Sequence, residues 1–340
     1  MSNKKLKKTI SLFLRKPIED KNFSVENFYY DLFKKFKHKN LEICIKVCPL
    51  KSTNVFNRVF LCFWAFFNQG SINHICGDVN FISIFLNKNK TINTILDCYS
   101  MKRLKGIKRF IYKIFWIRVP YIKSSKIITI SKKTLRDFNS FIISENTKKI
   151  DVIGVCVSDK FKKNFKSKIN QIPKILIIGT AINKNIFNII SSLQNIKCET
   201  IIIGELKEKI IKKLKFYNLN YKNYVSLSKK KLVNKYKECD LLLYPSKFEG
   251  FGMPIIEAQS IGRPVITSKF EPMKSVAGNG ALYVNPNSIK EISNGVKLVL
   301  KNKKLRNSII KKGFINIKKY KPEVILNKHY RVYEDVLNNL

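Results

Sequence analysis

The stretch YPSKFEGFGMPIIEAQSIGRPVIT, residues 244–267, has the pattern of a turn and a helix between two strands. The apolar run 241–244 ends at proline and serine, which is typical of a buried strand. The glycines in 250–252 allow a tight turn, and Pro254 suits the first position of a helix because its missing N–H would have no partner there. Residues 264–268 form the next strand. The segment therefore predicts a βαβ unit.

Two carboxylates lie in this unit, Glu249 in the turn and Glu257 in the helix. The free N–H groups of a helix N-terminus carry partial positive charge, so the unit also predicts a site for an anion such as a diphosphate. Taken singly, Glu249 is equally explained as a solvated turn residue and Glu257 as a carboxylate near the start of a helix.

The same segment resembles the donor-site signature of retaining GT-B glycosyltransferases of the group-1 or family-4 type. That signature is Pro-Ser, two residues, Glu-Gly-Phe-Gly, one residue, Pro, two residues, Glu-Ala and later Gly-x-Pro-Val, and every fixed position is present. The resemblance implies that Glu249 contacts donor-sugar hydroxyls at the catalytic centre and that Glu257 contacts the nucleotide ribose. Phe251, Gly252 and Met253 complete the donor-binding set of this turn.

The fold class expected is α/β. Strand-like and helix-like segments alternate along both halves of the 340 residues, which favours a doubly wound parallel sheet in each half. The resemblance implies a GT-B fold, with two Rossmann-like domains facing across a cleft. We expect an acceptor-binding domain over 1–160, a nucleotide-sugar-binding domain over 172–320, and a helix over 321–340 that returns to the N-terminal domain. The polar, basic stretch 158–171 is the expected linker.

A second donor-side element follows the strand predicted at 174–179. Gly179 lets the backbone approach a ligand, and Lys184 is placed to neutralise a diphosphate. The family usually has Gly-Arg, four residues and Lys, whereas here Thr180 replaces the arginine and the lysine comes one residue earlier. We expect Gly179, Thr180 and Lys184 to belong to the donor-binding set. Lys184 could equally be one of many surface lysines. Without the arginine, we expect backbone N–H groups near Gly252 to make more of the hydrogen bonds to the anion.

Residues 74–78 of the N-terminal half resemble a His-x-x-Gly-Asp element found near the cleft in some of these transferases. The resemblance implies that His74 contacts a sugar hydroxyl or phosphate as a catalytic residue and that Asp78 lies on the acceptor side. A purely structural histidine at a strand end is the alternative.

Two further positions bear on the N-terminal site. Leu96 stands where the family's Thr-x-His-Asp element has histidine, which removes a polar group from the expected sugar pocket. Ser24 and Glu26 are acceptor-binding candidates at the start of a predicted helix, although helix capping explains both equally well.

The chain carries 66 Lys and Arg against 23 Asp and Glu, a formal net charge of +43. Lysine greatly outnumbers arginine, as expected from codon bias in an AT-rich genome, while attraction to anionic lipid, glycan or nucleic acid is the functional alternative. The eight cysteines are scattered singly and only three histidines occur, so neither a zinc site nor a disulfide framework is indicated. Free thiols in a reducing cytoplasm are expected.

Two apolar segments of the first half bear on membranes. Residues 54–68 predict a helix that is apolar on several sides and is therefore expected to be buried, and the run is shorter than the ~20 residues that span a bilayer. The helix predicted at 104–119 has an apolar stripe beside several cations, and this stripe either packs on the sheet or reaches an anionic leaflet. We expect a cytoplasmic protein, with peripheral attachment to the inner face of the membrane as an open alternative.

These observations together predict a retaining, metal-independent glycosyltransferase of polysaccharide or lipopolysaccharide biosynthesis. It would move a sugar from a nucleoside-diphosphate sugar to a glycan or lipid-linked acceptor. No cofactor and no metal is expected, because the chain has no Asp-x-Asp and no phosphate-loop motif. No specific nucleic-acid partner is expected, because nucleic-acid binders often concentrate arginine and this chain does not. A non-catalytic GT-B protein that binds nucleotide-sugar or glycan, and a polyanion-binding protein supported by charge alone, are the alternatives.

Overall fold

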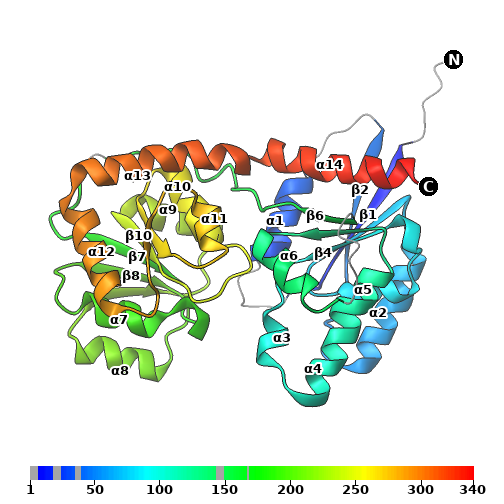
Figure 1. Cartoon of the computed structure of the whole chain (residues 1–340), viewed down its shortest axis with the longest axis horizontal. Helices are drawn as coiled ribbons and strands as arrows, with labels where there is room; N and C mark the ends of the chain where they lie inside the picture. Colours follow the sequence, from blue (N-terminus) through cyan, green and yellow to red (C-terminus); the bar gives the residue numbers. More distant parts are fainter. Residues whose placement is uncertain (1–6, 18–23, 35–39, 143–148, 167) are drawn as a thin grey trace. The chain divides into compact units, whose positions relative to one another are not determined.

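The computed structural model describes residues 7–17, 24–34, 40–142, 149–166 and 168–340, without the side chains of 24–27. The chain divides into two compact units (Figure 1). The first contains Met1–Cys156 and Pro322–Leu340, and the second contains Val157–Lys321. Each unit is built on a six-stranded parallel sheet with helices around it. The α/β class predicted from the alternating segments is confirmed.

The sheet of the first unit has the order β2-β1-β3-β4-β5-β6. Its strand order reverses at β1, because β2 lies on one side of β1 and all later strands lie on the other. In doubly wound sheets, ligand-binding loops gather at such a reversal. The strands are β1 (Lys8–Leu14), β2 (Leu41–Val47), β3 (Ile72–Cys76), β4 (Thr91–Ile95), β5 (Lys126–Thr129) and β6 (Ile150–Val152).

The last helix of the chain, α14 (Pro322–Asn338), packs on α1 (Ser24–Phe33) and β3. The other helical segments of this unit are α2 (Val55–Phe67), η1 (Asn80–Phe85), η2 (Lys88–Lys90), α3 (Tyr99–Arg103), α4 (Gly106–Tyr112), η3 (Lys113–Arg118), α5 (Val119–Ile122) and α6 (Lys132–Asn139). The helix predicted at 104–119 is a continuous run of α4, η3 and α5, in which η3 is a turn of π-helix.

The expectation that the helix at 54–68 is buried is wrong. Only Leu61, Cys62 and Ala65 of α2 are buried, and the opposite side of the helix consists of exposed aromatic and aliphatic side chains. A helix with one face against a sheet buries only that face, whatever the composition of the other. Among the described residues, no helix has both the length and the apolar character needed to cross a membrane.

The sheet of the second unit has the order β12-β11-β10-β7-β8-β9, with its reversal between β7 and β10. The strands are β7 (Lys174–Ile178), β8 (Glu199–Ile203), β9 (Asn220–Tyr224), β10 (Leu241–Tyr244), β11 (Val265–Ser268) and β12 (Leu282–Val284). From the sequence alone, the third of these strands is predicted at 224–227, which is too late along the chain. Its five residues, NYKNY, are polar at the edge of the sheet and lack the apolar run that marks the central strands.

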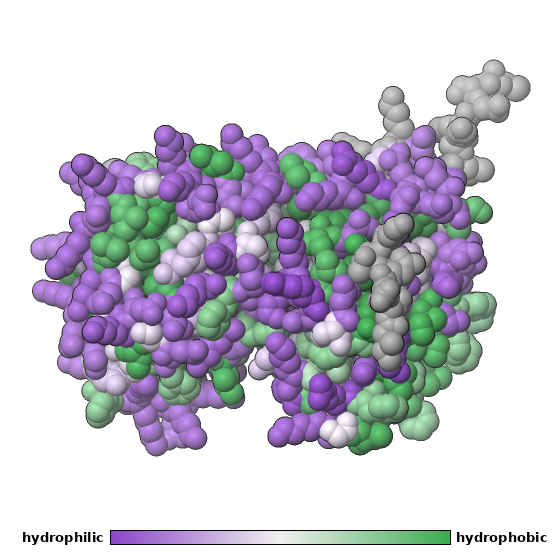
Figure 2. Space-filling model, viewed as in Figure 1, coloured by the Kyte–Doolittle hydropathy of each residue, from purple (hydrophilic) through white to green (hydrophobic). Residues whose placement is uncertain are grey.

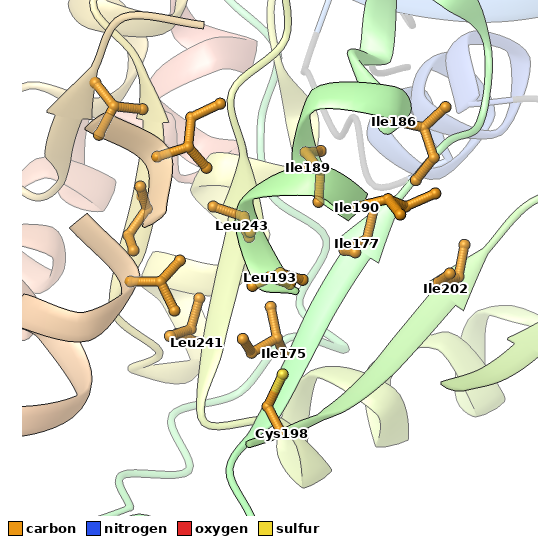
Figure 3. Close-up of a cluster of buried hydrophobic side chains, with 14 of the residues drawn as sticks. Ile175, Ile177, Ile186, Ile189, Ile190, Leu193, Cys198, Ile202, Leu241 and Leu243 are labelled. Atoms are coloured by element: carbon orange, nitrogen blue, oxygen red, sulfur yellow. The ribbon is translucent and has the colours of Figure 1, made fainter. Parts of the chain in front are cut away.

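The core of the second unit lies between its sheet and the covering helices. Figure 3 shows Ile186, Ile189 and Leu193 of α7 (Ile186–Leu193) against side chains of β7 and β10. The remaining helical segments are η5 (Ile182–Lys184), α8 (Glu208–Phe216), α9 (Lys229–Glu238), α10 (Met253–Ile261), α11 (Met273–Ala277), α12 (Ile289–Lys301), α13 (Lys303–Asn316) and η6 (Ile317–Tyr320). Strands β7 and β10 contribute side chains to this core, and the loops of the candidate site follow their carboxyl ends.

The stretch 158–171, expected to be a linker, is instead packed onto the second unit. The buried guanidinium of Arg263 donates through Nη1 to the Asn164 carbonyl at 2.6 Å, and Ser260 Oγ donates to the Phe161 carbonyl at 2.6 Å. These bonds join residues 99 positions apart, so the polar composition of 158–171 could not predict them.

Candidate donor-binding site

The candidate site lies where the order of the second sheet reverses. β7 and β10 are hydrogen-bonded neighbours, and the chain leaves each of them by a loop at its carboxyl end. The loop after β7 contains Gly179–Asn185, and the loop after β10 contains Pro245–Gly252. The two loops therefore meet at the position where doubly wound sheets bind their ligands.

Lys184, Tyr244 and Glu249 form one hydrogen-bonded cluster at this position. The Lys184 ammonium lies 2.7 Å from Glu249 Oε1 and donates to the Tyr244 hydroxyl at 2.9 Å. The Tyr244 hydroxyl in turn donates to Glu249 Oε1 at 2.7 Å. Burial and the negative charge of Glu249 raise the pKa of Tyr244 well above its usual value, so the phenol stays neutral and acts as the donor.

Gly179 makes room for the lysine stem. Its φ is +88°, and a Cβ at this position would lie 2.9 Å from Lys184 Cγ. Any larger residue would both strain the backbone and push the lysine away from Glu249. Gly179 and Lys184, predicted as donor-binding residues, are thus brought together by the structure.

Two asparagines that the sequence analysis missed hold the two loops together. Asn183 Nδ2 donates to the Phe248 carbonyl at 2.9 Å, and Asn185 Nδ2 donates to the Pro245 carbonyl at 3.1 Å. Asn185 is buried and has a φ of +64°, a left-handed conformation that asparagine adopts more readily than most residues. The sequence signal that could have identified Asn185 is an asparagine placed just before a helix, in a loop that begins with glycine.

The helix after the second loop presents its N-terminus at the site. Gly252, with φ of +104°, precedes α10, and Met253 is its first residue. Pro254 is the second residue of the helix, one position later than the first position predicted for it. Because Pro254 has no N–H and the Ile255 N–H donates to the Gly252 carbonyl at 3.0 Å, the N–H of Met253 is the first that could bind an anion.

Glu257 is one turn further along α10 and is half-buried. The Tyr236 hydroxyl of α9 donates to its Oε2 at 2.6 Å. Burial raises the pKa of the Glu257 carboxyl to about 7, although the bond from Tyr236 and the charge of Lys229 act in the opposite direction. Tyr236 is a second contributor that local sequence reasoning did not find, because it comes from a different helix.

Two other predicted donor-binding residues have structural contacts of their own. Phe251 is buried with its ring perpendicular to that of Tyr320, at 5.6 Å between centroids, so its side chain packs rather than projecting toward a ligand. Thr180 Oγ1 donates to the Glu205 carbonyl at 2.6 Å and thereby ties the loop after β7 to the end of β8. A threonine here therefore supports the loop and brings no positive charge.

The structure places His74 in the core of the first unit. Its side chain has no exposed surface, Nδ1 lies 2.7 Å from the Tyr333 hydroxyl of α14, and Nε2 lies 2.9 Å from Thr94 Oγ1. Burial and the nearby His329 lower the pKa of His74 well below its usual value. With both ring nitrogens occupied and no accessible atom, the imidazole is structural here, which corrects the expectation of a contact to substrate.

Asp78 follows β3 at the reversal point of the first sheet and keeps exposed surface. Loss of hydration in the surrounding protein raises the pKa of its carboxyl to about 6, while the positive charge of Arg15, which follows β1, acts in the opposite direction. Leu96 follows β4 and is half-buried. The side chains of the predicted acceptor residues Ser24 and Glu26 lie outside the described residues.

Comparisons with known proteins show which proteins the chain is similar to. Residues 159–315 match the protein family described as glycosyl transferases group 1. The O-antigen chain mannosyltransferase RfbU of Salmonella typhimurium is 26% identical over 247 residues, which are 67% of this chain and 65% of that protein. The N,N'-diacetylbacillosaminyl-diphospho-undecaprenol alpha-1,3-N-acetylgalactosaminyltransferase of Campylobacter jejuni is 25% identical over 129 residues, 37% of this chain and 34% of that protein.

Solved structures show the same fold at low sequence identity. Sucrose-phosphate synthase from Thermosynechococcus elongatus has a TM-score of 0.78 at 12% identity, covering 98% of this chain and 100% of that one. Anabaena HepE in complex with UDP and glucose has a TM-score of 0.79 at 12% identity, covering 96% and 100%.

The fold places the chain in the GT-B class of proteins with two Rossmann-like units. Residues 159–315, which lie within its second unit, match the group 1 glycosyl transferases. The resemblance drawn from residues 244–267 is confirmed to this extent.

Proposed function

We propose that the protein is a glycosyltransferase that moves a sugar from a nucleoside-diphosphate sugar to a glycan or lipid-linked acceptor. The cluster of Lys184, Tyr244 and Glu249 at the reversal point of the second sheet carries this proposal, because it lies beside the N-terminus of α10 and inside the segment that matches the family. The relatives named for O-antigen and lipid-linked sugars favour polysaccharide or lipopolysaccharide biosynthesis as the setting.

The proposed chemistry follows from where positive charge is available. The leaving diphosphate gains negative charge as the glycosidic bond breaks, and the Lys184 ammonium together with the N–H of Met253 would stabilise that charge. A lysine and a helix terminus can perform this role without a divalent cation, so we propose a metal-independent reaction. In this scheme the lysine exchanges Glu249 for the diphosphate, and the freed carboxylate accepts hydrogen bonds from donor-sugar hydroxyls.

Glu257 would bind the nucleotide ribose through Oε1, since its Oε2 already accepts the bond from Tyr236. Asp78 is proposed on the acceptor side of the first unit. We propose retention of the anomeric configuration, with attack on the face from which the diphosphate leaves and with a phosphate oxygen taking the acceptor proton. No protein nucleophile is needed for that route.

The decisive experiment begins with binding. Each nucleoside diphosphate and nucleotide-sugar is tested for its effect on the melting temperature, since a ligand at 100 times its dissociation constant adds about 2.7 kcal/mol to the free energy of unfolding. The best ligand is then offered with lipid-linked acceptors, in the presence of a chelator, and release of nucleoside diphosphate is measured. NMR of the product reports the anomeric configuration.

The variants separate the proposal from its alternatives. Glu249→Gln should still bind the bare nucleoside diphosphate but should lose sugar transfer. Lys184→Met should lower the affinity for diphosphates more than the affinity for the nucleoside alone. Phe216→Ser, an exposed change on α8, is the matched control and should behave as wild type. Ligand binding without turnover on any acceptor would favour the non-catalytic GT-B alternative, whose support is the threonine at 180 and the leucine at 96.

A further inference from the structure

Helix α2 is apolar on both of its sides. Its inner face lies in the core of the first unit, whereas its outer face is exposed along the whole helix. Phe56 and Phe67 are 87% and 80% exposed, and Phe60 and Phe63 are each 50% exposed. These four residues follow one another at spacings of four, three and four, so they form one stripe along the helix. Contiguous exposed apolar surface of this kind marks an interaction site.

Helix α4 extends this surface. Its side chains of Ile107, Phe110 and Ile111 are exposed, so the stripe that could have packed on the sheet faces outward. The Arg58 guanidinium of α2 lies 5.1 Å from the Trp116 ring in η3, the π-helical turn that directly continues α4. Figure 2 shows apolar residues gathered on the first unit over α2 and α4. We call Phe56, Phe60, Phe63, Phe67, Ile107, Phe110 and Ile111 the apolar face.

The apolar face lies in a strongly cationic part of the chain. Residues 43–123 contain 13 Lys and Arg but only two acidic residues, Asp78 and Asp97. Lys105, which directly precedes α4, and Lys108 and Arg109 within the helix are exposed. Exposed aromatic side chains with cations beside them are the combination found on helices that lie at an anionic lipid surface.

We propose that the apolar face docks on an anionic lipid bilayer, with α2 and α4 lying in the plane of the headgroups. With 13 residues, α2 is about 20 Å long, too short to cross the ~30 Å of hydrocarbon, so it inserts only its outer side. A second copy of the chain is a poorer occupant, because each copy carries a formal charge of +43 and the two would repel. This inference does not depend on the proposed transferase activity.

The test uses the full chain and vesicles. Wild type should co-sediment with vesicles of phosphatidylglycerol and phosphatidylcholine in equal parts, and bind vesicles of phosphatidylcholine alone much more weakly. The charge of the whole chain would by itself give binding that disappears at high salt. The apolar face predicts a fraction of the binding that persists there, because burial of aromatic surface is not screened by salt.

Two variants locate that fraction. Phe56→Ser with Phe67→Ser should reduce binding at high salt at least roughly tenfold, because a buried phenylalanine contributes enough for about that factor. The matched control replaces two exposed residues of the second unit, Phe216→Ser with Ile315→Ser, and should bind as wild type. Equal loss in both variants, or in neither, would overturn the proposal.

A charge series tests the cationic rim. Changing Lys105, Lys108, Arg109 and Lys113 to Gln should lower binding at low salt more than changing four exposed lysines near α8, namely Lys207, Lys209, Lys212 and Lys215. Equal effects would show that only net charge acts, which contradicts a localised docking surface.

Fluorescence reports the orientation directly. Phe56→Trp should show a blue shift in its added emission on binding vesicles, while Phe216→Trp should not, because only the first enters the lipid. If instead wild type is a dimer without lipid and the Phe56→Ser, Phe67→Ser variant is a monomer, the apolar face joins two copies and the bilayer proposal fails.

Discussion

The ammonium of Lys184 and the carboxylate of Glu249 lie 2.7 Å apart, although 65 residues separate them in the chain. Lys184 belongs to the loop after β7 and Glu249 to the loop after β10, so their pairing joins the two strands at which the sheet order reverses. The pair is partly buried, with side-chain exposures of 23% and 11%. Each of the two charges therefore neutralises the other.

A double-mutant cycle measures this coupling. We expect Lys184→Met and Glu249→Gln to be coupled by about 1 kcal/mol in the free energy of unfolding, between the values for exposed ion pairs and for buried charged hydrogen bonds. Urea unfolding of the two single variants and the double variant gives the number. The exposed pair Lys212–Glu208 on α8, at 2.6 Å, is the matched control and should couple by no more than ~0.5 kcal/mol. Coupling no larger than in that control would contradict the proposed role of burial.

Glu257 should make donor binding depend on pH near neutrality. Its pKa is about 7 in the free protein, so the carboxylate becomes the dominant form as pH rises from 6 to 8. A charged acceptor bonds ribose hydroxyls more strongly than a neutral one by about 1 kcal/mol, so affinity should rise about fivefold over this range. Calorimetry with a nucleotide-sugar is suitable, because its diphosphate has no proton to lose there.

Two variants check the assignment to Glu257. Glu257→Gln should bind more weakly and show no such rise. Tyr236→Phe should move the midpoint of the rise to higher pH, because the lost hydrogen bond favours the ionised carboxylate. A pH profile that is the same in all three proteins would exclude this carboxyl as the titrating group.

The buried histidines should make the protein less stable in acid. Burial lowers the pKa of His329 to about 3, whereas the unfolded residue titrates near 6.5. The unfolded state therefore binds the extra proton first, and stability falls as pH drops from about 6.5 toward 3. His329→Gln should remove about 1 kcal/mol per pH unit from the dependence between pH 6 and pH 5.

That effect is measured as the difference between variant and wild type in urea unfolding. The raised pKa values of Glu257 and Asp78 act with the opposite sign in both proteins, since their folded forms bind protons more readily than the unfolded chain. Identical slopes in the two proteins would show that His329 is protonated in the folded state or does not remain buried.

Leu96→His should leave the fold intact. The side chain is half-buried at the end of β4, so an imidazole there keeps access to water, and the loss of stability should stay below about 1 kcal/mol. The neighbouring Ile95 is 3% exposed within a core cluster, and Ile95→His is expected to lose at least ~2 kcal/mol. Thermal unfolding compares the two variants, and an equal drop in melting temperature would place Leu96 in the core.

Residues 241–268 determined one βαβ unit of the fold by themselves. Proline at the start of a helix, glycine at positive φ and apolar runs in strands are preferences that act within a few residues, so strand β10, helix α10 and strand β11 could be predicted from them. The edge strand β9 and the packed segment 158–171 were misplaced because their contacts are made with distant residues. The same holds for Tyr236, which reaches Glu257 from another helix.

The sequence alone determined which residues are apolar or charged, and tertiary structure decided which of them face solvent. A helix such as α2 offers apolar groups on every side, and only the sheet behind it selects the face that is buried. His74 has the local surroundings of a site residue, yet Tyr333 of α14, 259 positions later, covers it in the core. Burial of this kind is a property of contacts between distant segments, which no local pattern of side chains encodes.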